Sequence, residues 1–204
     1  MYLTKTPSFI QSLFPDYIWR VPTDERILHL TFDDGPIPDV TEWVLDQLKK
    51  FEAKATFFCV GENVQRHPKV YQRILSEGHS VGNHTHHHKN GWQTDKVQYL
   101  DNVAKCAEHV DSKLFRPPYG RLKPNQAKEI KKQYDIIMWD VLTGDFDPSL
   151  NPQDCYHAII KETKPGSILV FHDSLKAAPV LKEVLPRVLK HYNEQGYIFE
   201  ALSS

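Results

Sequence analysis

The sequence predicts an α/β fold in which parallel strands alternate with helices. Apolar runs of strand length alternate with amphipathic segments of helix length from residue 27 to the end of the chain. The alternation gives about seven strand–helix units, and no linker or change of composition interrupts it. Strands separated by helices are normally parallel and joined by right-handed crossovers. Such units fit a closed or nearly closed barrel or an open, doubly wound sheet, and periodicity alone does not separate the two.

The predicted strands are short apolar runs that end at turn residues. Ile27 begins the first run, which ends at the turn Asp33-Asp34-Gly35-Pro36, and Gly61 stops the second run. The predicted strands are residues 27–32, 55–60, 79–82, 113–116, 134–139, 167–171 and 197–201.

The predicted helices show apolar residues at intervals of three and four. Val40, Val44 and Leu48 give this spacing in the first of them, and Pro68 and Gly78 stand at the favoured start and end positions of the second. The predicted helices are residues 39–51, 68–78, 94–110, 124–133, 152–163 and 179–195.

The composition is that of a globular protein of one domain. The chain has 204 residues, 25% of them charged and 40% apolar, with a formal net charge of −1. This balance gives no reason to expect nucleic acid as a partner. No apolar run reaches the roughly 18–20 residues that span a bilayer, and the first residues lack the apolar stretch of a secretory signal. We therefore expect a cytoplasmic protein, unless a leader has been removed, and we take it to be a monomer.

The cysteines predict no disulfide framework. There are three of them, widely spaced and without a Cys-x-x-Cys pair. We expect Cys59, Cys106 and Cys155 to be buried thiols that pack as small apolar residues.

Polar residues gather at the ends of the predicted strands or directly after them. The carboxyl ends of parallel strands meet on one face, where active sites are built. Five segments that are far apart in the sequence are therefore expected to converge there. These residues are Asp33, Asp34, His84, His88, Arg116, Asp145, His172 and Asp173.

Two of these segments indicate a metal site. The adjacent carboxylates of Asp33 and Asp34 repel each other unless a cation or a basic partner is close. His84 and His88 are four residues apart, which lets two imidazoles meet one ion on a helical turn. Two histidines and one carboxylate make a hydrolytic zinc site or a facial-triad iron site. The alternatives are a solvated Asp-Gly turn and an exposed histidine-rich loop, and His86 and His87 are expected to be exposed loop residues.

Four motifs, in order, resemble the signatures of polysaccharide deacetylases, the NodB-homology enzymes of carbohydrate esterase family 4. The motifs are Thr31-Phe32-Asp33-Asp34-Gly35-Pro36, His84-Thr85-His86-His87-His88, Arg116-Pro117-Pro118-Tyr119-Gly120 and Leu169-Val170-Phe171-His172-Asp173. The resemblance runs from residue 27 to the C-terminus and implies a distorted (β/α)7 barrel. Residues 27–204 then form the NodB-like domain, and residues 1–26 are expected to be an extension that packs on the barrel.

The resemblance also implies a role for each matching residue. It implies a divalent metal, most often zinc but also cobalt or nickel, which lowers the pKa of a water molecule and polarises the acetyl carbonyl. The implied metal ligands are Asp34, His84 and His88. The implied catalytic residues are Asp33 as the base, Arg116 as the group that holds it, His172 as the acid, Asp145 as the carboxylate that tunes the acid, and Tyr119 through its backbone N–H at the oxyanion. The implied substrate contacts are Leu169, at the acetyl methyl, Pro118 and Phe146.

The chain departs from the family pattern at one position. The family usually has Asp-Trp where this chain has Asp145-Phe146, so the wall of the groove is smaller. Trp139 lies six residues earlier, and we expect it to pack in the core.

The function implied is the hydrolysis of an N-acetyl group on a sugar of a chitin-like or peptidoglycan-like glycan. An O-acetyl esterase or a non-sugar amidase with the same site is the alternative. A catalytically silent carbohydrate-binding protein is a third hypothesis, but it requires the loss of a base or an acid, and Asp33 and His172 are both present.

Overall fold

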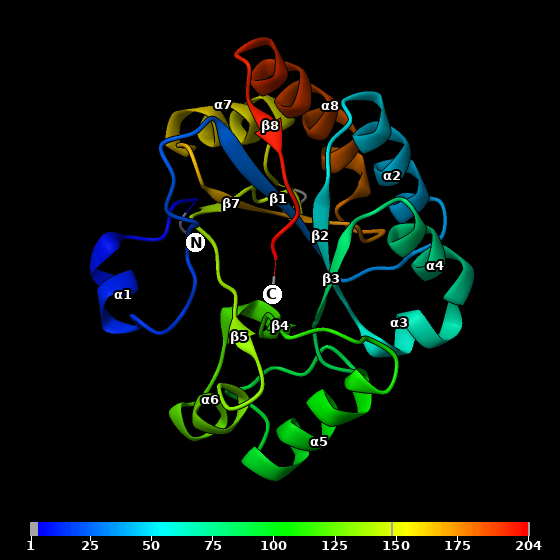
Figure 1. The fold of residues 1–204 in the computed structure, drawn as a ribbon, viewed down its shortest axis with the longest axis vertical. Coiled ribbons are helices and arrows are strands. Elements are labelled where there is room, and N and C mark those ends of the chain that lie inside the picture. The colour runs from blue at the N-terminus through cyan, green and yellow to red at the C-terminus, as the bar shows by residue number, and fades with distance from the viewer. Residues whose placement is uncertain (1–3, 148, 204) are drawn as a thin grey trace.

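The core of the molecule is a parallel sheet that curls into a half-barrel (Figure 1). The computed structural model describes residues 4–147 and 149–203. The strand order is β5-β4-β3-β2-β1-β7-β6, and β8 pairs with β1 outside this path. The strands are β1 (Ile27–Asp33), β2 (Ala55–Cys59), β3 (Ser80–Asn83), β4 (Leu114–Phe115), β5 (Asp135–Ile136), β6 (Val141–Leu142), β7 (Ile168–His172) and β8 (Ile198–Phe199).

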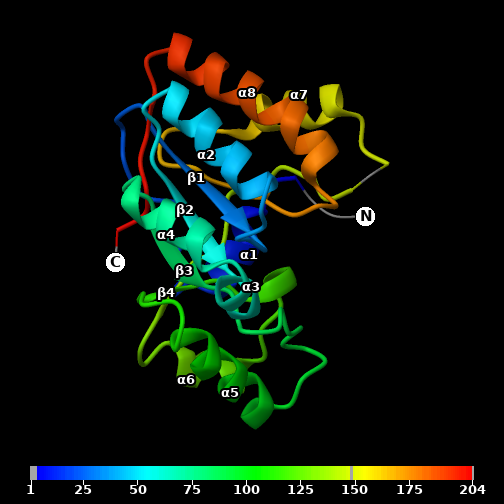
Figure 2. The ribbon, with the colours of Figure 1, turned by 90° about the vertical axis from the view of Figure 1, so that its right-hand side faces the viewer.

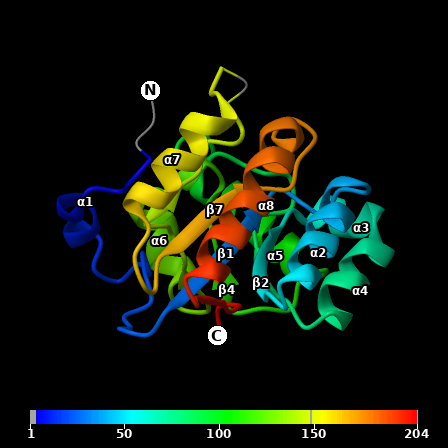
Figure 3. The same cartoon turned by 90° about the horizontal axis from the view of Figure 1, so that it is seen from above.

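Helices cover the convex face of the sheet, as the views in Figures 2 and 3 show. Helix α1 stands at one side of the molecule, away from the other helices (Figure 1). The helices are α1 (Ser8–Leu13), α2 (Val40–Lys50), α3 (Gly61–Arg66), α4 (Pro68–Ser76), α5 (Lys96–Ala107), α6 (Pro124–Ile130), α7 (Pro152–Glu162) and α8 (Ala178–Glu194), with a 3-10 turn at Pro118–Gly120.

Side-chain alternation along β1 separates two layers of the core. Leu28, Leu30 and Phe32 are fully buried in the large cluster that joins the sheet to helices such as α2 and α8. Full burial of each such side chain contributes about 1.5–3 kcal/mol. Thr31 and Asp33 point to the inner side, where both contact the buried guanidinium of Arg116. The inner face of the half-barrel is therefore polar toward the carboxyl end of β1.

The predicted barrel is confirmed, but the predicted strand at residues 134–139 is shorter in the structure and an additional strand follows it. The run forms only β5, and β6, which the apolar pattern does not predict, follows after a break. The carbonyl groups of Ile137 and Met138, which lie in the break, accept hydrogen bonds from Arg116 at 3.2 and 2.9 Å. A side chain thus takes acceptors that a continuous strand would use in its ladder.

The N-terminal segment lies along this break. The backbone of Ile18 donates to the carbonyl of Ile136 at 2.9 Å and accepts from the amide of Met138 at 2.7 Å. Further bridges join Lys5 to Val141 and Arg20 to Ser167. Residues before β1 therefore contribute hydrogen bonds to the wall of the half-barrel.

The three cysteines are buried and free, as the sequence predicts. Cys106 lies close to Cys59, with its thiol 3.6 Å from the carbonyl oxygen of Cys59. Burial raises the pKa of Cys106 to about 12, so this thiol stays protonated at neutral pH.

Candidate active site

The carboxyl ends of the strands surround a cavity of about 560 Å³ that collects most of the predicted site residues. Residues from distant parts of the sequence meet there because parallel strands bring their carboxyl ends to the same edge. The lining residues are Asp33, Asp34, His84, His88, Tyr119, Gly120, Arg121, Trp139, Leu142, Phe146, Val170, His172, Ser174 and Lys176.

Asp34, His84 and His88 form a cluster that could hold a metal ion. One ligand atom from each of the three lies within 4.8 Å of the others. The Oδ1 atom of Asp34 is buried and receives no hydrogen bond, although Nε2 of His88 is 3.1 Å away. A buried carboxylate oxygen without a donor is costly unless a cation approaches it. Burial alone would raise the pKa of Asp34, but the imidazoles of His88, His172 and His84 hold it well below its usual range.

The hydrogen bonds of the two histidines aim their Nε2 atoms at Asp34. Nδ1 of His84 lies 2.7 Å from the carbonyl oxygen of Arg116, which can only accept, so Nδ1 carries the proton and Nε2 keeps a free lone pair. Burial lowers the pKa of His84 to about 4, so the ring is neutral at pH 7. Nδ1 of His88 contacts the hydroxyl of Tyr119 at 3.2 Å. Both rings therefore suit metal ligation.

The local backbone differs from the expected helical turn. His84 and His88 lie in an irregular loop after β3, in which Thr85 and His88 have positive φ angles of 61° and 51°. The loop rather than a helix brings the rings together, with centroids 5.1 Å apart. His86 also differs from expectation, because it is buried with Nδ1 unpartnered, while His87 is exposed. Neither belongs to the metal-ligand cluster.

Asp33 is held by a fully buried arginine. The NH1 group of Arg116 donates to Oδ1 of Asp33 and to Oγ1 of Thr31, both at 2.7 Å. The side chain of Arg116 also donates to two backbone carbonyls and stacks over Phe58 at 4.1 Å. These contacts leave the guanidinium one orientation, so the carboxylate of Asp33 is fixed and its Oδ2 faces Nε2 of His84 at 3.9 Å.

His172 is held by Asp145 in the same way. Both oxygens of the fully buried Asp145 contact His172, one at Nδ1 and the other at the backbone amide, each at 2.8 Å. Nε2 of His172 therefore remains for a substrate. Burial alone would lower the pKa of His172, but the adjacent carboxylate of Asp145 raises it to about 9. The ring is thus protonated at neutral pH and can give up a proton.

Aromatic and aliphatic side chains form the wall of the cavity. Tyr119 is 60% exposed and has a φ of 61°, which turns it over the ring of His88. Phe146 packs its edge against His172, with centroids 5.0 Å apart. Trp139 packs against the core, as expected, and it also lines the cavity, which was not expected.

Two predicted substrate contacts lie elsewhere. Leu169 is buried among the residues between the sheet and the helices, because successive side chains of β7 point to opposite faces. Val170, which shares a face with His172, lines the cavity instead, and the period of two in the strand could have identified it. Pro118 is buried in the 3-10 turn and does not line the cavity, although its neighbour Tyr119 does.

The rim of the cavity carries two cations that the sequence analysis did not identify. Arg121 and Lys176 line the cavity, and neither forms an ion pair in the part of the chain that the structure describes. The guanidinium of Arg121 stacks over Trp92 at 5.1 Å, and this indole is 60% exposed. An exposed indole therefore lies beside one of the two cations of the rim.

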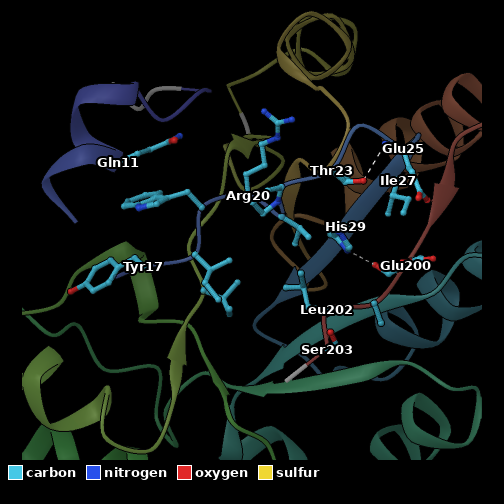
Figure 4. Close-up of a pocket in the computed structure, with 16 residues that line it drawn as sticks. Gln11, Tyr17, Arg20, Thr23, Glu25, Ile27, His29, Glu200, Leu202 and Ser203 are labelled. Carbon is cyan, nitrogen blue, oxygen red and sulfur yellow. Dashed lines mark hydrogen bonds between the residues drawn. The ribbon is translucent and has the colours of Figure 1, made fainter. Parts of the chain in front are cut away.

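A larger cavity of about 780 Å³ lies beside the start of β1 (Figure 4). Its walls come mainly from the N-terminal segment and the last residues of the chain, among them Ile18, Trp19 and Leu202. His29 also lines it and contacts the carbonyl oxygen of Glu200 at 2.9 Å. None of the predicted site residues lies there, so size alone does not mark the active site.

Solved structures with the same fold include deacetylases. The crystal structure of the Bc1960 peptidoglycan N-acetylglucosamine deacetylase in complex with 4-naphthalen-1-yl-N-oxidanyl-benzamide superposes with a TM-score of 0.85 and 30% identity, covering 96% of this chain and 94% of that one. The Xyl-CE4 domain of a multidomain xylanase from the hindgut metagenome of Trinervitermes trinervoides gives a TM-score of 0.76 and 28% identity, with 88% of each chain covered. The fold is thus that of carbohydrate esterase family 4.

Sequence comparison gives the family directly. The sequence model of the polysaccharide deacetylase family matches residues 20–138, and the chain belongs to this family. A peptidoglycan-N-acetylglucosamine deacetylase of Bacillus cereus is 32% identical over 193 residues, which cover 91% of this chain and 90% of that protein. The peptidoglycan-N-acetylmuramic acid deacetylase PdaC of Bacillus subtilis is 29% identical over 183 residues, but the match covers only 38% of it.

Proposed function

We propose that the chain is a metal-dependent deacetylase that hydrolyses the N-acetyl group of an amino sugar in a glycan. The observation that carries this proposal is the buried Oδ1 of Asp34, which lies between two imidazoles and receives no hydrogen bond. The same site contains the carboxylate of Asp33, which Arg116 holds, and the imidazole of His172, which Asp145 holds. Asp34, His84 and His88 would hold the ion, and a set of two histidines and one carboxylate suits zinc, with cobalt and nickel as other candidates. A divalent cation supplies Lewis acidity and lowers the pKa of water.

Asp33 acts as the general base in this proposal. Arg116 neutralises its charge and fixes its orientation, while its Oδ2 faces the metal-ligand cluster. In this proposal the carboxylate accepts a proton from the water that attacks the acetyl carbonyl. A positioned base of this kind contributes typically 10²–10⁴-fold to the rate.

His172 acts as the general acid. Its pKa of about 9 keeps the ring protonated at neutral pH, and Nε2 is free to donate because Asp145 occupies Nδ1. Protonation of the amine nitrogen lets the C–N bond break, because an unprotonated amine is a very poor leaving group. The products are acetate and a free amino sugar. The backbone N–H of Tyr119 is proposed at the oxyanion, and Val170 and Leu142 at the acetyl methyl.

The rim favours a glycan that carries carboxylates. In this proposal Arg121 and Lys176 contact an anionic sugar or an acidic substituent, and the exposed indole of Trp92 beside Arg121 stacks on a sugar ring. The relatives named as peptidoglycan deacetylases agree with such a substrate. An O-acetyl ester remains the second candidate, because the Xyl-CE4 domain belongs to a xylanase.

The location and assembly of the protein stay predictions. No helix in residues 4–147 and 149–203 combines the length and hydropathy that crossing a bilayer requires. The cytoplasmic location and the monomeric state expected from the sequence are tested by cell fractionation and by light scattering of the purified protein.

The test of the proposed function separates the two neighbouring aspartates. Asp33→Asn should retain the metal and lower kcat by about 10²-fold or more, since the base is lost while the ligands remain. Asp34→Asn should lose the metal, because an amide oxygen is a poorer ligand than a carboxylate. Elemental analysis and acetate release from a chito-oligosaccharide measure the two effects. Full activity in both variants would refute the mechanism, and a reversed pattern of metal loss would exchange the two roles. Acetyl xylan assayed in parallel decides between amide and ester substrates.

A further inference from the structure

A buried carboxylate that the proposed mechanism does not use lies under the loop of Asp34. Asp173 follows the proposed acid His172 in the sequence and is fully buried. Its Oδ1 accepts a hydrogen bond from the amide of Gly35 at 3.0 Å, and its Oδ2 accepts one from the hydroxyl of Thr41 at 2.5 Å. The hydroxyl of Thr41 in turn accepts from the amide of Ile37 at 2.7 Å. One carboxylate therefore reaches both ends of the turn that follows Asp34.

The turn needs such support because its backbone is unfavourable. Asp34 has a φ of 86°, a region that residues other than glycine rarely adopt and that costs of the order of 1–3 kcal/mol. A Cβ atom on Gly35 would lie only 2.0 Å from Oδ2 of Asp173, so the carboxylate occupies the space that a side chain would need. The glycine and the aspartate thus depend on each other.

Other elements hold the same turn from the opposite side. The side chain of Asn63 donates to the carbonyl oxygen of Asp34 at 2.8 Å, and the amide of Val60 donates to the carbonyl oxygen of Gly35 at 2.9 Å. The amide of Asp173 itself donates to the carbonyl oxygen of Asp33 at 3.1 Å. The backbone around Asp34 is therefore fixed by α3 and by the residues that directly follow β2 and β7.

Burial of the Asp173 carboxylate costs free energy that packing alone does not explain. No Lys, Arg or His forms an ion pair with it in the described part of the chain. Burial raises its pKa to about 7, and the nearby charge of Asp34 adds to this effect. Burial of a carboxylate without a cationic partner costs free energy, and the hydrogen bonds from Gly35 and Thr41 are what offset this cost. Its retention is better explained by what it does for Asp34.

We propose that Asp173, together with Thr41, is a positioning residue that fixes the Asp34 carboxylate for metal binding. The inference rests on the proposed function in one respect, namely that Asp34 is a metal ligand. Replacing a group that orients a metal ligand typically lowers metal affinity or activity 10- to 100-fold. Because Asp173 touches the turn and not the cavity, its effect should appear in metal affinity and kcat, while KM stays near the wild-type value.

The test compares substitutions at Thr41 with a matched control. Thr41→Val removes the hydroxyl at almost constant volume, and Thr41→Ser restores it. Thr56→Val is the control, because Thr56 is a buried threonine whose hydroxyl also accepts from a backbone amide, that of Leu202 at 2.8 Å, and it does not line the candidate active site. Zinc affinity of the metal-free proteins is measured by competition with a chromophoric chelator, and the visible spectrum of the Co²⁺-loaded proteins reports ligand geometry.

The expected result is a loss of zinc affinity of about 10-fold or more in Thr41→Val, with a changed Co²⁺ spectrum and recovery in Thr41→Ser. Asp173→Asn should show the same kind of loss. Thr56→Val should lower the melting temperature and keep the wild-type zinc affinity. Wild-type affinity and spectrum in both Thr41→Val and Asp173→Asn would overturn the inference, even if both proteins melt earlier. A wild-type protein that binds no zinc, cobalt or nickel would instead overturn the proposed metal site.

Discussion

Replacement of Asp145 by Asn should move the alkaline limit of activity to lower pH. The two proteins differ in one charge at the 2.8 Å contact with Nδ1 of His172. Without that carboxylate, burial still lowers the pKa of His172 and only the charges of Asp34 and Asp33 oppose it, so the pKa falls from about 9 toward the ordinary value of about 6.5. At pH 8 an imidazole with a pKa of about 6.5 is protonated in about 3% of molecules, against about 90% for a pKa of about 9. The loss of the protonated acid alone should therefore lower kcat roughly 30-fold at pH 8.

The assay is the pH dependence of kcat for acetate release at saturating metal. The wild-type profile should fall as the pH rises through about 9, and the Asp145→Asn profile should already fall below pH 7. Asp147→Asn is a control on the same loop, because the carboxylate of Asp147 is hydrogen-bonded to Ser149 and not to His172, and its profile should follow the wild type. An Asp145→Asn profile that still falls near pH 9 would refute the assignment of the alkaline limit to this pair.

The same pair predicts a pH dependence of stability. The pKa of His172 is higher in the folded state than the unfolded value of about 6.5, so its contribution is fully present below that pH. The contribution is lost as the pH rises through about 9. Melting temperatures measured from pH 6 to 10 should therefore fall more steeply for the wild type than for Asp145→Asn, and parallel curves would contradict this reasoning.

Three further predictions concern the wall, the rim and the thiols. Leu169→Ala should lower the free energy of unfolding, measured by denaturant titration, by about 2–5 kcal/mol and leave KM unchanged. Val170→Phe, which fills the cavity, should raise KM. A changed KM in Leu169→Ala and an unchanged KM in Val170→Phe would show that Leu169 lines the site. The double variant Arg121→Ala/Lys176→Ala should raise KM roughly 2- to 30-fold for a carboxylate-bearing glycan fragment, at about 0.2–1 kcal/mol per exposed charge contact; an equal rise for a neutral chito-oligosaccharide would count against charge recognition. Reductant should leave the melting temperature unchanged, because the cysteines are free, and a large drop would reveal a disulfide.

The sequence predicts the fold well where the signal is periodic. Long strands and helices with clear periods, such as β1, β2 and α8, lie where the apolar pattern puts them. The strand at residues 134–139 was predicted too long and β6 was not predicted, because a distant arginine takes the carbonyls between β5 and β6 and no local pattern records this. Tertiary contacts decided the structure there.

The same division holds for the candidate site. Residues that follow strands, such as Asp33, His84 and His172, meet in one cavity because topology alone brings them together. Leu169 was misplaced by one residue, although strand alternation contains the information that Val170 shares a face with His172. Arg121 and Lys176 carry no such signal, since exposed cations are common and only the surface shape places these two at the rim.

A chain of three hydrogen bonds connects the N-terminal segment to the proposed catalytic base. Ile18 accepts from the amide of Met138, the carbonyl of Met138 accepts from Arg116, and Arg116 donates to Asp33. A fusion partner or a compound that draws Ile18 away would free the backbone of Met138 and remove one restraint on the arginine. Ile18 lines the cavity of Figure 4, so a small molecule that displaced Ile18 from there would remove this restraint on Arg116 without occupying the candidate active site.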